Sequence, residues 1–130
     1  MKRDSEILKR RTTNFALRII RLYRSLPRTE EARILGKQLL RSSTSIVANY
    51  RAACRGRSRA EFIAKLGIVL EEADETLFWL ELFQEANIFP VEKLRDVVRE
   101  ANELVSIFVS SVQTAKGFTS AIVLLAPSAE

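Results

Sequence analysis

The sequence contains no histidine and only one cysteine, and both shortages restrict the chemistry that the chain can perform. Without histidine there can be no Ser-His-Asp triad, no Cys-His pair and no imidazole ligand for a metal, and the commonest general base is missing. Cys54 has no partner for a disulfide within the chain, which suits a reducing cytoplasm. Free cysteine usually behaves as a small apolar residue, although the nearby Arg51, Arg55 and Arg57 keep a reactive thiolate open as an alternative. We therefore expect no enzyme, no metal and no cofactor.

Glycine and proline are also scarce, with 4 and 3 among 130 residues, whereas 47% of the residues are hydrophobic and 28% are charged. This composition is typical of a compact helical protein and argues against disorder or a β fold with many turns. Residues 4–11 are charged where a signal peptide carries its apolar segment, and the apolar run at 121–126 is far shorter than the roughly 20 residues that span a bilayer. We expect one cytoplasmic domain without membrane association.

Apolar residues spaced by three and four positions predict four amphipathic helices. Pro27 lies between the first and second helices, and Pro90 lies between the third and fourth. Ser58 with Glu61 forms the S-x-x-E capping box that opens the third helix. Three weak helix formers precede Phe15, so we expect the first helix to fray there or to begin a separate turn. The expected helices span residues 5–26, 29–55, 58–87 and 90–116.

The links between these helices are short, at about two to five residues, and cannot cross the length of a bundle. Successive helices are therefore expected to be antiparallel neighbours. The predicted fold class is all-α, an antiparallel up-down-up-down four-helix bundle over residues 1–117. The remaining residues, 118–130, include Ile122 and Leu124 and are either a short packed tail or an expression remnant.

Within the third helix, residues 77–83 are apolar at six of seven positions, which covers nearly the whole circumference. One face is expected to meet the core through Leu77 and Leu80, and Phe83 is open to either the core or the outer face. The outer face predicts contact with a second copy of the chain, because an exposed aromatic patch marks an interface. The alternative is coverage by the tail of the same subunit. The candidate interface residues are Phe78, Trp79, Leu82 and Phe83.

Charge is divided unevenly along the chain. Residues 1–60 contain 16 Lys or Arg and 4 Asp or Glu, a net charge of +12, whereas residues 61–130 contain 5 and 12, a net charge of −7. Part of this charge is expected to pair across helices, and Arg41 should lie opposite residues 72–75, with Asp74 and Glu75 as its named partners. The acidic residues 71–75 do not predict a di-iron site, because that site needs histidine and acids from other helices.

The arginines left over predict a basic surface on the first two helices, and nucleic acid is the obvious polyanion to bind it. Binding would be mainly electrostatic and salt-dependent, since no base-reading motif is present. The candidate phosphate contacts are Arg10, Arg11, Arg18, Arg21, Arg24, Arg28, Arg51, Arg55, Arg57 and Arg59.

One segment resembles a known family. Residues 38–49 read Gln-Leu-Leu-Arg-Ser-Ser-Thr-Ser-Ile-Val-Ala-Asn, and Gly56-Arg57-Ser58 and Glu61-Phe62 follow. Together they resemble the bacterial four-helix-bundle family named for 23S rRNA intervening sequences, over about residues 15–114. The resemblance implies a homopentamer with a basic surface that binds RNA or DNA. The accessory protein of diversity-generating retroelements, which binds a reverse transcriptase and nucleic acid, has a related fold.

The family segment also has a packing interpretation and one departure. Ser42, Ser45 and Asn49 are small or polar seam residues predicted to let helices approach closely and to fix their register. Where many members read Asn-Ile-Ala-Glu-Gly, residues 49–53 read Asn-Tyr-Arg-Ala-Ala, which removes an acid and adds Arg51. Two functions stay open, an oligomer that binds nucleic acid and a structural or adaptor oligomer that docks an acidic protein such as a reverse transcriptase.

Overall fold

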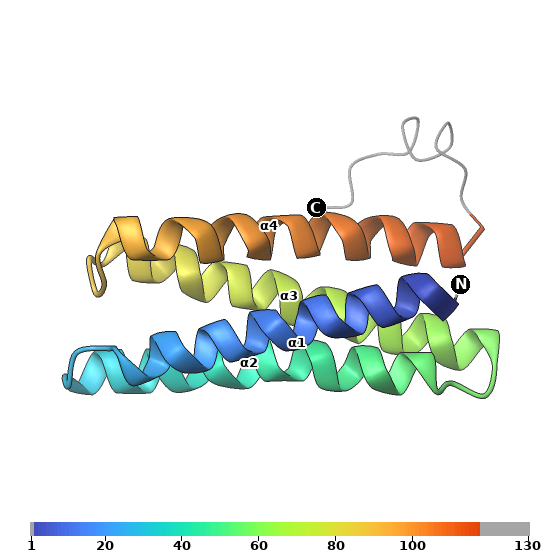
Figure 1. The fold of residues 1–130 in the computed structure, drawn as a ribbon, viewed down its shortest axis with the longest axis horizontal. Coiled ribbons are helices and arrows are strands. Elements are labelled where there is room, and N and C mark those ends of the chain that lie inside the picture. The colour runs from blue at the N-terminus through green and yellow to red at the C-terminus, as the bar shows by residue number, and fades with distance from the viewer. Residues whose placement is uncertain (1, 118–130) are drawn as a thin grey trace.

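The computed structural model describes residues 2–117, and they form four helices without a strand: α1 (Lys2–Arg24), α2 (Glu30–Cys54), α3 (Arg59–Glu85) and α4 (Val91–Ala115). Figure 1 shows the helices side by side, with the α1–α2 and α3–α4 links at one end of the molecule and the α2–α3 link at the other. The all-α four-helix prediction is confirmed, with helix ends within three residues of those expected. The predicted tail lies outside the described residues. No helix within residues 2–117 is long and apolar enough to cross a membrane.

The helix starts follow from side-chain caps. Thr29 Oγ1 accepts a hydrogen bond from the Ala32 N–H at 3.2 Å, and Ser58 Oγ accepts one from the Glu61 N–H at 3.0 Å. Each bond satisfies an N–H group that has no partner within its own helix. Glu61 completes the predicted capping box in a variant form, because its carboxylate accepts the N–H of Arg57, one residue before the cap.

The link between α3 and α4 is a Schellman turn. Asn87 has a φ of 55°, a left-handed conformation that asparagine tolerates better than most residues. Its N–H binds the Gln84 carbonyl at 3.2 Å, and the next N–H, from Ile88, binds the Phe83 carbonyl at 3.1 Å. The turn therefore satisfies two carbonyls at the end of α3 before Pro90 opens α4.

The expected fraying of α1 before Phe15 is wrong, because α1 is continuous from Lys2 to Arg24. Thr12 is fully buried, and its hydroxyl donates to the Leu8 carbonyl at 2.8 Å, while the hydroxyl of Thr13 donates to the Lys9 carbonyl at 2.7 Å. These bonds within the helix satisfy the side chains that otherwise compete with helical structure.

The core runs along the bundle axis, and each helix contributes large side chains that are fully buried. They include Phe15, Ile19, Leu39, Ile46, Leu66, Leu80, Phe83, Leu94, Leu104 and Phe108. Small residues bring α2 close to its neighbours. A Cβ added at Gly36 would lie 3.1 Å from Tyr23 Cδ1 on α1 and 2.7 Å from Leu26 Cδ1 in the link that follows, so α1 and α2 meet closely there.

Three small or polar residues of α2, Ser42, Ser45 and Asn49, were predicted to bring helices together, and one of them does so. Ser42 is fully buried, and its hydroxyl is hydrogen-bonded at 2.8 Å to that of Thr76 on α3. Asn49 and Ser45 are half-buried instead, and the Asn49 amide donates to the hydroxyl and the carbonyl of Ser45 within the same helix. Of these three residues, only Ser42 therefore links two helices.

Candidate nucleic-acid interface

The outward side of α1 carries a row of cations. Arg10, Arg21 and Arg24 are exposed and share this side with Leu17, because their positions differ by close to whole numbers of helical turns. A rise of 1.5 Å per residue places Arg10 and Arg24 about 21 Å apart along the axis. None of the three side chains makes an ion pair or hydrogen bond with another residue of 2–117. They are therefore available to an external anion.

A second row lies on α2, and half of it was missed in the sequence. Arg51 and Arg55 are exposed as predicted, but Arg33 and Lys37 are exposed on the same side of α2 and were not among the candidates. The signal was present in the spacing, since Lys37 and Arg51 are 14 positions apart, which is close to four helical turns. We call the seven cations of both rows the basic face: Arg10, Arg21, Arg24, Arg33, Lys37, Arg51 and Arg55.

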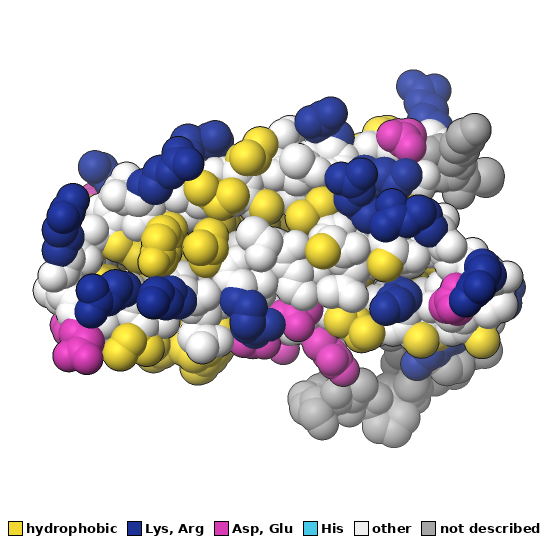
Figure 2. All heavy atoms as spheres, turned by 90° about the horizontal axis from the view of Figure 1, so that it is seen from below, with side chains coloured by type: hydrophobic (Ala, Val, Ile, Leu, Met, Phe, Trp, Pro, Cys, Tyr) yellow, Lys and Arg dark blue, Asp and Glu magenta, His cyan; other side chains and the backbone are white. Residues whose placement is uncertain are grey.

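Figure 2 shows this side of the molecule, seen from below the view of Figure 1, where α2 is the lowest helix. Dark blue Lys and Arg side chains are spread along its whole length, with yellow hydrophobic side chains between them. Two of the exposed hydrophobic residues on α1 and α2 are Leu17 and Ile34, at 44% and 52% exposure. The face is therefore cationic and partly apolar.

Arg11 is not part of the basic face, and its prediction as a phosphate contact is corrected by its position on the α4 side of α1. Its guanidinium binds Glu100 through Nε at 2.7 Å and Nη2 at 2.9 Å, and it also pairs with Glu103. The hydrogen bonds to Glu100 raise the pKa of Arg11 further above its ordinary value. Arg11 therefore joins α1 to α4 instead of facing a ligand.

The remaining predicted arginines occupy different surroundings. Arg18 is half-buried on α1, and Arg28 is exposed in the α1–α2 link. Arg57 is almost fully exposed and lies 4.0 Å from the Glu61 carboxylate. Arg59 donates a hydrogen bond to the Ala115 carbonyl, so it joins the start of α3 to the end of α4. Arg57 and Arg59 therefore make contacts within the bundle, whereas Arg18 and Arg28 lie outside the two rows of the basic face.

The predicted ion pair between α2 and α3 forms within the expected segment, but one of the two named partners of Arg41 is wrong. Arg41 binds Glu75 and also Glu72, at 3.3 Å, whereas Asp74 is exposed and takes no part in this pair. Asp74 lies on a different side of α3 because one helical step turns the side chain by about 100°. The Arg41 guanidinium, followed by the Trp79 indole, holds the pKa of Glu75 below its usual range.

The outer side of α3 presents the aromatic patch expected from its sequence. Phe78 is 51% exposed, Trp79 and Leu82 are half-buried, and the two aromatic rings meet edge to face at 4.9 Å. Phe83 is wrong as an interface residue, because it is fully buried in the core with Leu80. The patch therefore consists of three of the four predicted residues.

The described residues contain no group of three or more acidic or cysteine side chains placed to hold a metal ion. What this surface offers chemically is fixed positive charge. Guanidinium groups on a rigid helix bind phosphate oxygens through paired N–H donors, without regard to base sequence.

Comparison with known proteins agrees with this architecture. The family model described as 23S rRNA-intervening sequence protein matches residues 3–110. A solved crystal structure, of a protein with unknown function from the S23 ribosomal protein family of Bacteroides thetaiotaomicron, is 37% identical. The similarity covers 84% of this chain and 97% of that one, with a TM-score of 0.77. No curated protein matches the chain. The chain belongs to the family of 23S rRNA-intervening sequence proteins.

Proposed function

We propose that this protein is a non-catalytic, oligomeric subunit with up-down-up-down topology that binds RNA or DNA through its basic face. The observation that carries the proposal is the pair of cationic rows on the outward sides of α1 and α2. The α1 row has no internal anionic partner among residues 2–117, whereas Arg11 and Arg41, on the same two helices, do. Surplus cations that are held on rigid helices and left unpaired favour a polyanionic ligand.

The test measures affinity for duplex DNA and structured RNA across a salt series. Replacing Arg10, Arg21 and Arg24 together by glutamine removes three charges from α1. If all three contact phosphate, the slope of log K against log salt on duplex DNA becomes shallower by about 2.7, from about 0.9 for each contact.

The matched control removes the same charge from another surface. Lys93, Arg95 and Arg99 are exposed on α4, and their joint replacement by glutamine should leave the slope unchanged. An equal loss in both triple variants would show that net charge alone controls binding. Wild-type protein that binds neither nucleic acid at low salt refutes the proposal.

Self-association is the second part of the proposal, and the resemblance implies a pentamer. It is supported by the aromatic patch on α3, where Phe78 stands half exposed among acidic neighbours such as Asp74 and Glu81. Phe78→Ala changes a surface residue and should lower the mass measured by light scattering. A wild-type chain that is monomeric at the same concentrations contradicts this part.

Docking of an acidic protein is the second candidate function, and one observation favours it. Leu17 and Ile34 are exposed beside the cations of the basic face, and apolar contact area of this kind is used at protein interfaces more than in phosphate binding. A specific partner that co-purifies after nuclease treatment, and whose binding is lost on Leu17→Ser, would support docking over nucleic-acid binding.

A further inference from the structure

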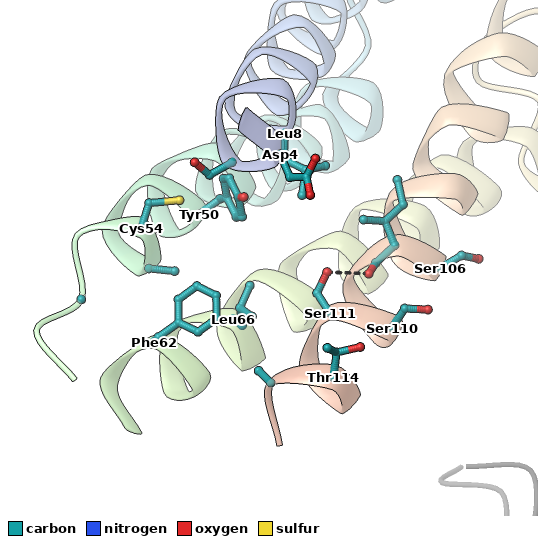
Figure 3. Close-up of a pocket in the computed structure, with 15 residues that line it drawn as sticks. Asp4, Leu8, Tyr50, Cys54, Phe62, Leu66, Ser106, Ser110, Ser111 and Thr114 are labelled. Carbon is teal, nitrogen blue, oxygen red and sulfur yellow. Dashed lines mark hydrogen bonds between the residues drawn. The ribbon is translucent and has the colours of Figure 1, made fainter. Parts of the chain in front are cut away.

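A large groove opens between α1 and α4 at the end of the bundle where α1 begins and α4 ends (Figure 3). Its volume is about 1030 Å³, and its apolar lining includes Leu8, Phe62, Leu66 and Ile107. A second hollow of about 440 Å³ shares Ile107 and Ser106 with it and continues along α4 to Asn102, where Arg11 and Glu103 also line it. The two hollows therefore form one path beside α4.

The larger hollow is lined by apolar side chains together with hydroxyl groups, among them Ser106, Ser110 and Thr114, and it carries little charge. Among the described residues, Asp4 is the only charged one that lines it. Its floor is continuous with the core, because Tyr50 is 5% exposed and its ring packs against Phe108 with centroids 5.6 Å apart. On the wall formed by α4, the Ser111 hydroxyl donates to the Ile107 carbonyl at 2.8 Å, as the dashed line in Figure 3 marks. This lining does not resemble an anion site.

The chain itself contains a segment of matching chemistry. Residues 118–125 read Phe-Thr-Ser-Ala-Ile-Val-Leu-Leu and carry no charge. They follow directly on the groove, because Thr114 and Ala115 line it and Gly117, with a φ of 86°, turns the chain out of the α4 helix. The family match ends at residue 110, so this segment lies beyond the part of the chain shared with the family model.

Length also fits. The path from Thr114 back to Asn102 covers twelve helical steps, about 18 Å, whereas eight residues can extend over about 26 Å. The aromatic patch on α3 is a less accessible target. The end of α4 lies beside Arg59 at the start of α3, and Phe78 is nineteen steps further along α3, about 29 Å away.

We propose that residues 118–125 dock in the groove between α1 and α4 of their own subunit. The contacts expected for its apolar side chains are with Leu8, Phe62 and Ile107, which line the hollow between these two neighbouring helices. The proposal is independent of nucleic-acid binding, because the basic face lies on the outward sides of α1 and α2.

Cys54 provides a direct reporter, since it is the only cysteine in the sequence and it lines the groove. The experiment measures the rate at which a thiol reagent labels Cys54 in the folded, full-length protein. If the segment occupies the groove about nine-tenths of the time, the double variant Ile122→Asp with Leu124→Asp should be labelled about tenfold faster. A synthetic peptide of residues 118–130, added to this variant, should slow labelling again.

Ser128→Asp is the matched control, because it adds a charge to the same tail outside the apolar segment, and it should be labelled at the wild-type rate. Circular dichroism checks that each variant keeps its helices. Equal labelling rates for wild type and the double variant overturn the proposal. Protection that rises with protein concentration also overturns it, because the occupant is then a second copy.

Discussion

The ion pair between Arg11 and Glu100 should contribute to the stability of the fold and not to ligand binding. Arg11→Gln removes a guanidinium that is 33% exposed and that contacts Glu100, 19% exposed, at 2.7 and 2.9 Å. Hydrogen bonds to charged groups contribute about 1.5–3 kcal/mol when shielded, and exposed ion pairs less than about 1 kcal/mol. Partial exposure places the expected cost of Arg11→Gln between these ranges, at about 1–2 kcal/mol.

Urea unfolding of wild type, Arg11→Gln, Glu100→Gln and the double variant measures the coupling directly, and we expect about 1 kcal/mol. Arg99→Gln is the control, because its pair with Asp96 lies within α4 and both side chains are more than 60% exposed, so its cost should be about 0.3 kcal/mol. Additivity of the two single variants within about 0.3 kcal/mol refutes the reasoning. In nucleic-acid binding, Arg11→Gln should keep the wild-type salt slope, whereas Arg21→Gln should reduce it by about 0.9.

Three further outcomes are expected. Gly67→Ala should stabilise the protein by about 1 kcal/mol in urea unfolding, because its Cβ would meet no atom within 4 Å and alanine favours a helix interior; a lower midpoint contradicts this. Thr76→Val should cost about 1 kcal/mol through loss of the buried hydrogen bond to Ser42, and in a Ser42→Ala background the same change should cost clearly less. Arg41 lowers the pKa of Glu75, so the stability that this pair contributes is complete above pH 4.5, the ordinary pKa of the carboxylate. That contribution is lost as the pH falls through the lowered pKa of Glu75 in the folded protein. The free energy of unfolding of Glu75→Gln should therefore fall less steeply with decreasing pH than that of wild type.

The helix boundaries could be predicted because their signals are local. Ser58 and Glu61 lie three residues apart and cap α3 through bonds that depend on little else in the fold. Pro90 directly precedes α4. The break expected near Thr12 was wrong, because the poor helix propensity of this residue is offset by its burial and by its hydrogen bond to the Leu8 carbonyl.

The partners of charged side chains could not be predicted equally well, because they depend on how helices are rotated about their axes. From the sequence, Arg11 was predicted to be one of the arginines without an acidic partner, yet it pairs with Glu100, which lies 89 residues away on α4. Asp74 and Glu72 are two positions apart, and only rotation decides which of them meets Arg41. The same dependence on helix rotation left Phe83 open between the core and the interface, and its prediction as an interface residue was wrong.

Net charge differs most between helices at opposite corners of the bundle. α1 contains eight Lys and Arg and two Asp and Glu, a net charge of +6, whereas α3 contains two and seven, a net charge of −5. Each of the two packs against α2 and α4, so they lie diagonally across the axis. This separation gives the subunit a transverse electric dipole. A polyanion exerts a torque on such a dipole before contact, so encounters at low salt should begin with α1 already turned toward the ligand.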